Sequence, residues 1–184
     1  GVEAMSLYHH FPSRGDVLDA VVEEVLRGIP LPGREVADPV TRMMASARLY
    51  RGAALEHPRA FVLLATRRFA TPGALAFLDR LLEPLRDAGL SPSAMARWFR
   101  VIGYFIGGAG LADVASRAQQ SDPTALVMEQ PVDPHAYPLV ARVAPHLRVE
   151  RLDGIFEAGL AVLEAALRAE VEALGPGRAR RRKR

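Results

Sequence analysis

Cysteine is absent from the 184 residues of the chain. Its absence excludes disulfide bridges, thiol nucleophiles and metal sites that use thiolate ligands. The sequence also lacks an apolar run of the ~18 residues that a transmembrane helix requires, and it shows no basic segment followed by an apolar core, as a secretory signal peptide would. We therefore expect a cytoplasmic protein without membrane contact, folded around an ordinary hydrophobic core.

Recognisable patterns for catalysis or metal binding are missing too. Neither Gly-x-Ser-x-Gly nor His-Glu-x-x-His occurs, and the five histidines are not spaced as metal ligands. The glycine-rich run 107–110 is not a phosphate loop, because no strand precedes it and no Gly-Lys-Ser/Thr follows. The sequence therefore predicts no enzyme, no metal site and no cofactor. An enzyme on a helical scaffold stays a rival interpretation, for which no nucleophile–base pair can be named.

Positive charge is concentrated at the end of the sequence. The net charge of the chain is +3, yet residues 177–184 alone carry six positive charges, so the remainder is mildly acidic. Such a cluster attracts polyanions, including the phosphates of DNA. A solvated end is the more common role of a charge run, and we expect residues 176–184 to form a basic disordered tail.

Helix boundaries are marked by short polar residues followed by proline. The polar side chain accepts a hydrogen bond from an amide of the first turn, and the fixed φ of proline suits the first helical position. Ser13 with Asp16 resembles a capping box, and Gly28, Gly89 and Gly175 stand where helices would end. The proline pairs are Asp38-Pro39, Thr71-Pro72, Ser91-Pro92, Asp122-Pro123 and Asp133-Pro134.

Between these boundaries the apolar residues recur every three or four positions, which is typical of amphipathic helices, and no strand pattern appears. The sequence predicts an all-α fold with a loop over residues 118–133. Pro84 should kink the helix that contains it. The expected helices lie near 4–10, 13–27, 39–56, 58–68, 72–88, 92–117, 134–145 and 148–174.

Gly103, Gly107 and Gly110 lie on one stripe of the predicted helix 92–117. Each glycine costs a helix ~1 kcal/mol relative to alanine. Three features could offset that cost in free energy: a closely packed partner, a bulky ligand or a deliberate break in the helix.

The first fourteen residues form a tight turn, a short helix and a proline stop. Gly1, Val2, Ser6, Leu7, Tyr8, His10 and Phe11 match the pattern Gly-Val-x-x-x-Thr/Ser-Leu-Tyr-x-His-Phe-x-x-Lys, and Arg14 keeps the charge of the final lysine. This stretch resembles the second half of the helix-turn-helix of the TetR family. A helix of two turns is unstable alone, and one with polar residues on its outer face fits a DNA major groove.

The resemblance implies that operator DNA is a partner. It places Glu3, Ala4, Met5 and Ser6 against bases, and Tyr8, His9, His10 and Arg14 against the DNA backbone. The family's first helix and most of its second are not in the sequence, so we expect this chain by itself to read DNA poorly. Residues 1–28 are interpreted as the C-terminal part of the helix-turn-helix domain with its linker helix.

Residues 29–175 resemble the regulatory domain of the tetracycline-repressor branch, most clearly at Val62-Leu63-Leu64-Ala65-Thr66-Arg67 and Gly103-Tyr104-Phe105. That branch binds a magnesium–drug chelate with a histidine at the position of Leu63 and an acidic residue at that of Ala112. Neither leucine nor alanine can bind Mg²⁺, which prefers oxygen ligands. A tetracycline–magnesium effector is therefore not expected.

A pocket for a small hydrophobic effector is nevertheless expected in this domain. The resemblance implies that Ser46 and Tyr50 contact the ligand and that Thr66 and Arg67 belong to a turn that responds to it. An apolar cavity with few polar groups suits a drug-sized hydrophobic molecule, although such side chains are about as often simply core. The candidate ligand-binding residues are Ser46, Tyr50, Phe61, Leu63, Leu64, Thr66, Arg67, Trp98, Tyr104 and Phe105.

Helices 92–117 and 148–174 are the expected dimer interface, because the second resembles the family's last helix at Phe156-x-x-Gly159-Leu160. Gly154, Gly159 and the glycine stripe would permit a close four-helix bundle across a two-fold axis. We thus expect a homodimeric repressor that binds a palindromic operator and is released when effector binding moves segment 58–68 and the linker helix. The alternative is a helical ligand-binding or dimerisation module without a role on DNA.

Overall fold

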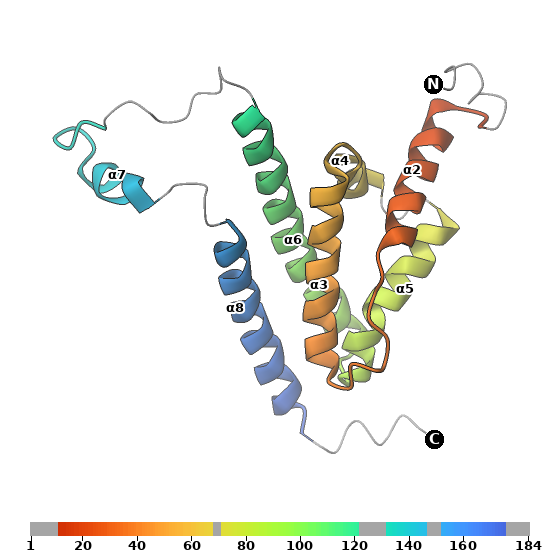
Figure 1. Cartoon of the computed structure of the whole chain (residues 1–184). Helices are drawn as coiled ribbons and strands as arrows, with labels where there is room; N and C mark the ends of the chain where they lie inside the picture. The colour runs from red at the N-terminus through yellow and green to blue at the C-terminus, as the bar shows by residue number, and fades with distance from the viewer. Residues whose placement is uncertain (1–10, 68–70, 122–131, 147–151, 176–184) are drawn as a thin grey trace.

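The computed structural model of the chain describes residues 11–67, 71–121, 132–146 and 152–175 (Figure 1). These residues form α-helices and one short 3₁₀ segment, with no strand among them, which confirms the all-α prediction. The elements are α2 (Arg14–Gly28), α3 (Pro39–Glu56), α4 (Pro58–Arg67), α5 (Pro72–Asp87), α6 (Pro92–Ser121), α7 (Pro138–Val143), η1 (Ala144–His146) and α8 (Leu152–Ala173).

Three of the polar residues before the prolines, Asp38, Thr71 and Ser91, act as the expected N-caps. The Asp38 carboxylate accepts a hydrogen bond from the amide of Thr41 at 2.9 Å, and Thr71, Ser91 and Ser13 accept equivalent bonds at the starts of α5, α6 and α2. Capping satisfies amides that have no partner inside the helix. Gly89 and Gly175 have positive φ angles of 85° and 67°, a conformation that glycine adopts without strain.

Two predicted boundaries were wrong. Helix α6 continues to Ser121 instead of ending at residue 117, because the sequence Ala118-Gln119-Gln120 favours helix. Helix α7 begins at Pro138 instead of residue 134. Ahead of it Asp133 closes a turn, since its carboxylate accepts from the amide of His135 and its carbonyl from that of Tyr137, both at 2.9 Å. Predicted helix 4–10, the pair at 122–123 and the start of helix 148–174 lie outside the described residues.

Helix α3 lies at the centre of the bundle and contacts α4, α5, α6 and α8 (Figure 1). Helices α6 and α8 run antiparallel beside it, and α2 packs against α4 and α5 on the other side. Pro84 is buried inside α5, where it leaves that helix uninterrupted. Helix α2 therefore meets the rest of the molecule mainly through α4 and α5.

Two hydrophobic clusters hold these helices together. The larger joins α3, α5, α6 and α8, and the smaller joins α2 with α3, α4 and α5. Tyr50 of α3 and Leu81 of α5 contact both clusters. The larger is centred on Met43, Met44, Leu85, Trp98, Ile102, Ile106, Phe156, Leu160 and Leu167, and the smaller on Val22, Leu26, Phe61, Leu64 and Phe77.

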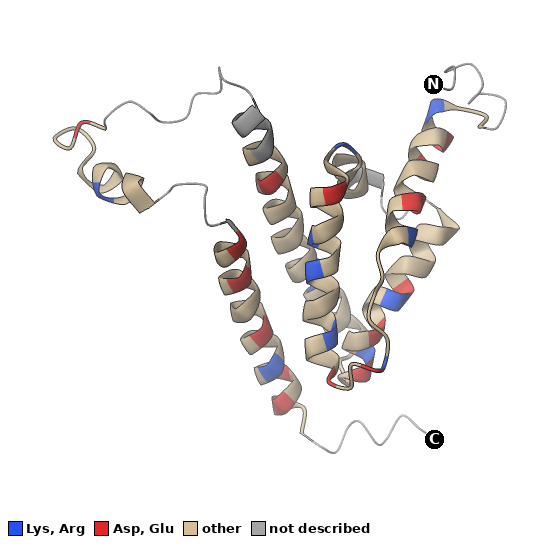
Figure 2. Cartoon of the chain, viewed as in Figure 1, with Lys and Arg blue, Asp and Glu red and all other residues tan. Residues whose placement is uncertain are grey.

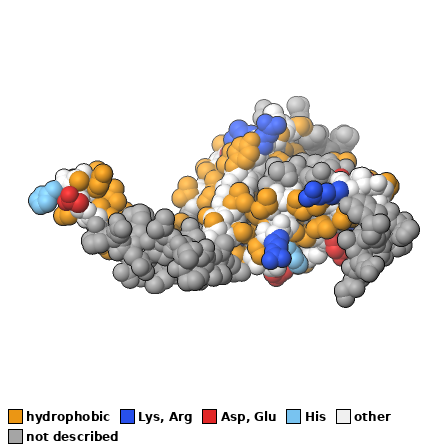
Figure 3. All heavy atoms as spheres, turned by 90° about the horizontal axis from the view of Figure 1, so that it is seen from above, with side chains coloured by type: hydrophobic (Ala, Val, Ile, Leu, Met, Phe, Trp, Pro, Cys, Tyr) orange, Lys and Arg blue, Asp and Glu red, His pale blue; other side chains and the backbone are white. Residues whose placement is uncertain are grey.

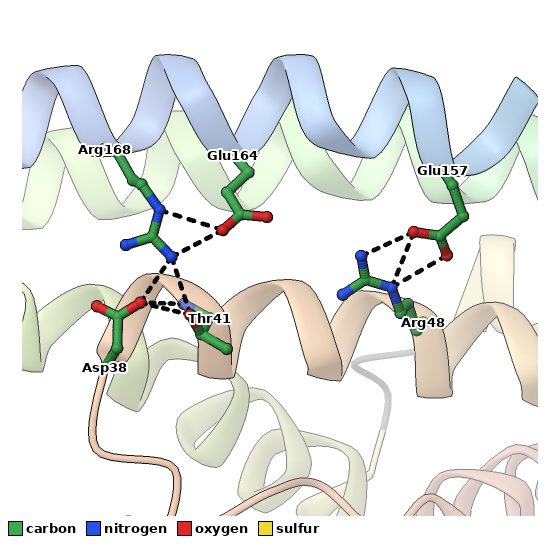
Figure 4. Close-up of polar contacts among 6 residues, drawn as sticks. All are labelled: Asp38, Thr41, Arg48, Glu157, Glu164 and Arg168. Carbon is green, nitrogen blue, oxygen red and sulfur yellow. Dashed lines mark hydrogen bonds and ion pairs between the residues drawn. The ribbon is translucent and has the colours of Figure 1, made fainter.

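Acidic residues occur along α8 (Figure 2), and two of them, Glu157 and Glu170, pair with Arg48 of α3 and Arg97 of α6. Figure 4 shows contacts that join α8 to α3 and to its N-cap residue Asp38. Arg168 pairs with Asp38 at 2.7 Å and also contacts Glu164, while Arg48 pairs with Glu157 at 2.7 Å. These pairs are largely exposed, so each contributes only about 0–1 kcal/mol. They set the register of α8 on α3 more than they stabilise it.

Helix α7 stands apart from the bundle, between the ends of α6 and α8 (Figure 1). None of its residues is buried, and the apolar side chains of Leu139, Val140 and Val143 are exposed. Figure 3 shows this segment, with its hydrophobic side chains, projecting from the body. Among the described residues, no helix is long and apolar enough to cross a membrane.

Candidate effector cavity

An apolar cavity lies between α3, α5 and α6, and residues of α2 and α4 complete its lining. The cavity has a volume of about 50 Å³ and lies inside a wider hollow of about 640 Å³ that includes open solvent. Helix α3 presents Met43, Ser46, Ala47 and Tyr50 to it. Their spacing of three and four residues places them on one face of that helix.

The other walls follow the same helical spacing. Helix α6 contributes Phe99, Ile102, Gly103, Ile106 and Gly107, and α5 contributes Phe77 and Leu81. Leu26 of α2 and Phe61 of α4 complete the lining. Five helices thus converge on the cavity, including α2, which follows the N-terminal motif in the sequence, and α4, which packs on α2.

Hydrogen-bonding groups in the lining come from Ser46 and Tyr50, and none of the lining side chains carries a charge. Ser46 is buried, and its hydroxyl donates to the backbone carbonyl of Arg42 at 3.0 Å. A serine hydroxyl has a single proton to donate, so its oxygen remains an acceptor on the cavity side.

Three aromatic rings of the cavity lining pack together. The rings of Tyr50 and Phe61 are 5.9 Å apart in an edge-to-face arrangement, and those of Tyr50 and Phe77 are 6.3 Å apart and tilted. Such geometries are the favoured ones for aromatic pairs. Helices α3, α4 and α5 are therefore linked through side chains that also touch the cavity.

The glycine stripe of α6 serves two purposes. A Cβ atom added to Gly110 would lie 2.6 Å from the Phe61 ring, so this glycine permits close packing. A Cβ atom added to Gly103 or Gly107 would meet nothing within 4 Å, and both residues line the cavity. Close packing, one of the three features considered for the stripe, thus accounts for Gly110, whereas Gly103 and Gly107 leave open space beside the cavity.

Charged residues next to the cavity are paired with each other and do not line it. The Arg51 guanidinium donates to Asp113 at 2.7 Å, and both side chains are buried between α3 and α6. The hydrogen bond to Asp113 raises the pKa of Arg51, so this group stays charged. At the other end of α3, Arg42 pairs with Asp87 at 2.5 Å. Burial works to raise the pKa of Asp87, but hydrogen bonds from Arg86 and Arg42 outweigh it and lower that pKa.

Only part of the predicted ligand-binding set lines this cavity. Ser46, Tyr50 and Phe61 do. Leu64 is instead buried in the smaller cluster, and Leu63 packs partly against the same cluster. Thr66 and Arg67 belong to the last turn of α4, and their side chains lie outside the described residues.

The α6 residues of the predicted set point elsewhere. Trp98 faces α8, where its indole N–H donates to Glu170 at 2.9 Å. Phe105 stacks on Phe156 with ring centres 5.4 Å apart, and Tyr104 is 71% exposed on the outer face. The structure brings the neighbouring Phe99 and Gly103 to the cavity instead, because successive helical residues are turned by about 100°. Trp98, Tyr104 and Phe105 thus belong to a helix that lines the cavity, but their side chains lie on other sides of that helix.

The close approach expected of Gly159 occurs within the chain. A Cβ atom added there would lie 2.6 Å from the Phe105 ring, so Gly159 makes room for a side chain of α6 in the same molecule. The contact between two copies that the sequence suggested for this glycine stays a prediction.

The predicted DNA-contacting residues Glu3, Ala4, Met5, Ser6, Tyr8, His9 and His10 lie outside the described residues. Arg14 is described, and it is exposed in the first turn of α2. Within the described ranges no three His, Cys, Asp or Glu side chains are grouped as metal ligands. The position of Ala112 is exposed, and its neighbour Asp113 is engaged by Arg51.

The sequence matches the model of the family described as "Tetracyclin repressor-like, C-terminal domain" over residues 30–171. A curated relative from Saccharopolyspora erythraea, an HTH-type transcriptional regulator, is 34% identical over 108 residues, which are 56% of this chain and 44% of the relative. The matched segment thus spans less than half of that relative.

Solved structures share the fold. One, described as a possible TetR family transcriptional regulator from Streptomyces coelicolor A3(2), gives a TM-score of 0.75 at 28% identity, covering 91% of this chain and 84% of the other. The Streptomyces coelicolor TetR family protein ActR, in complex with actinorhodin, gives 0.72 at 21% identity, covering 92% and 83%. Through the domain that surrounds the cavity, the chain belongs to the tetracycline repressor-like (TetR) family.

Proposed function

We propose that the protein is a ligand-responsive regulator of transcription, in which the cavity between α3, α5 and α6 binds a small hydrophobic effector. The observation that carries this proposal is the lining of the cavity. It is apolar, and it includes Leu26 from α2, which follows the N-terminal motif in the sequence, and Phe61 from α4, which packs on α2. The ActR structure, which contains actinorhodin, supports the use of this fold for an organic ligand.

Repression is the proposed mode, with operator DNA read through a complete helix-turn-helix. The motif over residues 1–14 supports this part of the proposal, and α2 continues directly from it. Helix α2 packs on α4 and α5, so any movement of α4 is transmitted to the segment that would lie in the DNA groove.

Phe61 is the proposed link between effector and DNA. Its ring borders the cavity, contacts Tyr50 edge-to-face and fills the space beside Gly110. An effector that binds one position of this ring better than another shifts the equilibrium of α4, and with it that of α2. An effector without such a preference would bind and leave DNA affinity unchanged.

A homodimer through α6 and α8 is the proposed assembly. Tyr104 and Leu111 on α6, and Ile155 and Val162 on α8, are large apolar residues that are exposed in the single chain. The two helices are neighbours, and paired apolar faces of this kind form half of a four-helix bundle. A two-fold axis there would place the DNA-binding helices of the two copies about one DNA turn apart. That spacing matches the two halves of a palindromic operator.

The test is a gel shift at fixed salt, using protein made from its own start codon and the DNA upstream of its gene. We expect a specific shift that is lost when Tyr8 and Arg14 are both replaced by alanine, and release of DNA by an effector. Release that persists in a Phe61→Ala variant would contradict the proposed link. Absence of any specific shift, with the protein folded and dimeric, would favour a ligand-binding module without a role on DNA.

A further inference from the structure

We propose that the cavity selects an uncharged, flat, ring-based ligand that donates a hydrogen bond to Ser46 and lies against the bare backbone of Gly103 and Gly107. This inference rests on the proposed function and specifies the chemistry of the effector. It is carried by three properties of the lining: its charge, its hydrogen-bonding capacity and its shape.

The lining offers no charge to a ligand. Its residues are all uncharged, and the buried charges nearby, Arg42 and Arg51, are engaged by Asp87 and Asp113. An ionised group that entered the cavity would lose its hydration without gaining a counter-charge, which is strongly unfavourable. The ring-bearing part of the ligand is therefore neutral at the pH at which it binds.

The hydrogen-bonding requirement follows from Ser46. Its hydroxyl proton is used by the carbonyl oxygen of Arg42 at 3.0 Å, and the side chain is buried. What remains for a ligand is an acceptor oxygen, which pairs with a donor such as a phenolic O–H or a ring N–H. At Ser46, a ligand carbonyl would place two acceptors together.

The shape requirement follows from α6. Gly103 and Gly107 are one turn apart, and space lies open where their side chains would be, so this wall presents backbone instead of protruding side chains. Four aromatic residues also line the cavity: Tyr50, Phe61, Phe77 and Phe99. Ring faces and edges make their best contacts with other rings. A planar ring system fits this combination better than a thick, saturated one.

The experiment titrates the chain with four probes near neutral pH: 1-hydroxypyrene, pyrene, 1-pyrenecarboxylate and the saturated 5α-androstan-3β-ol, the last by competition. We expect 1-hydroxypyrene to bind most tightly and the carboxylate at least about tenfold more weakly, because its charge must be desolvated. Ser46→Ala should weaken 1-hydroxypyrene about two- to tenfold and leave pyrene unchanged, since only the former loses a hydrogen bond.

A matched pair of variants tests the glycine wall. Gly107→Met should reduce 1-hydroxypyrene binding at least about tenfold by filling the space that the ring needs. Gly52→Met is the control, because Gly52 also lies within a helix, has open space at its Cβ position and does not line the cavity. Circular dichroism checks that both variants fold, and the probe ranking on the unmodified chain is independent of them.

Equal binding of the carboxylate, effective competition by the steroid, or unchanged binding in Gly107→Met would each overturn the inference. The proposed function fails separately. If the probes rank as expected but no bound molecule alters operator binding, the ligand preference is supported and the proposed regulatory role is contradicted. If a charged or saturated molecule releases operator DNA while the pyrenes do not bind, the regulatory role is supported and the ligand preference is contradicted.

Discussion

Arg51 of α3 and Asp113 of α6 form a buried ion pair in which the guanidinium donates two hydrogen bonds, at 2.7 and 3.1 Å, to the two carboxylate oxygens. The same guanidinium carbon lies 4.4 Å from the centre of the Phe156 ring on α8. One arginine thus connects three helices beside the cavity without entering it.

Asp113→Ala should destabilise the fold by about 3–5 kcal/mol, because it leaves a buried guanidinium without its main counter-charge. Unfolding in urea can be followed by the fluorescence of Trp98, the single tryptophan of the chain. The double variant Arg51→Met with Asp113→Leu should lose much less, because no charge then remains buried. A control at the exposed pair, Glu157→Ala, should cost less than about 1 kcal/mol. Equal losses at the two pairs would contradict this account.

Stability should fall as the solution becomes acidic. Hydrogen bonds from Arg168 and Thr41 hold the pKa of Asp38 well below its ordinary value of 3.8, and a hydrogen bond from Arg48 lowers the pKa of Glu157. Carboxylates with depressed pKa values bind protons more readily in the unfolded chain. Their stabilisation is therefore complete above the unfolded-state pKa, near 4, and is lost as the pH falls below it.

The contribution of Asp38 is measured as the difference between the urea concentrations at which half of the protein is unfolded at pH 7 and at pH 3.5. Asp38→Asn keeps a good helix cap but should reduce the difference between the two midpoints. Arg168→Met should reduce it in the same way, and the double variant should add little to either. Fully additive effects would mean that the two side chains act independently.

Two glycines of α6 should respond in opposite directions to alanine. Gly110→Ala places a Cβ atom 2.6 Å from the Phe61 ring and 3.1 Å from Ala54, so we expect a loss of about 1–3 kcal/mol through overpacking. Gly108→Ala adds a Cβ atom in open space on an exposed part of the helix and should gain up to about 1 kcal/mol. Thermal unfolding monitored at 222 nm distinguishes them, and a gain at both positions would show that Phe61 moves aside freely.

Charge introduced on the outer faces of α6 and α8 should dissociate the proposed dimer. The variant with Tyr104→Glu and Val162→Glu places four carboxylates in a dimer interface, where they repel each other and lose hydration. Sedimentation velocity should then report a monomer. Leu75→Glu on α5 is the control, since Leu75 is 54% exposed and lies away from α6 and α8. If the control dissociates equally, the interface lies elsewhere.

The helices and their starts could be read from the sequence because their causes are local. A residue such as Asp38 or Thr71 caps its own helix within three positions, so the pattern contains the whole interaction. The end of α6 was misjudged because the Gln, Ser, Asp and Pro residues over 118–133 suggested a loop, whereas residues 118–121 continue the helix.

The cavity was only partly predictable because it depends on which side of each helix faces inward. Periodicity gives one apolar side for an amphipathic helix, but α6 is apolar almost all round. It packs on α8 with Trp98, lines the cavity with Phe99 and exposes Tyr104. Only the packing of the other helices decides among these directions. The pair of Arg51 and Asp113, 62 positions apart, has no signal in a single sequence either.

Gly103 and Gly107 also bear on how this protein can change over generations. Glycine has no side chain to lose, so every substitution at these positions narrows the cavity and none widens it. Most substitutions would at the same time strengthen α6, since almost any other residue is a better helix former. Random mutation therefore pushes both positions toward a more stable protein that accepts smaller molecules. Selection for a large, flat ligand would be needed to hold the two glycines in place against that drift.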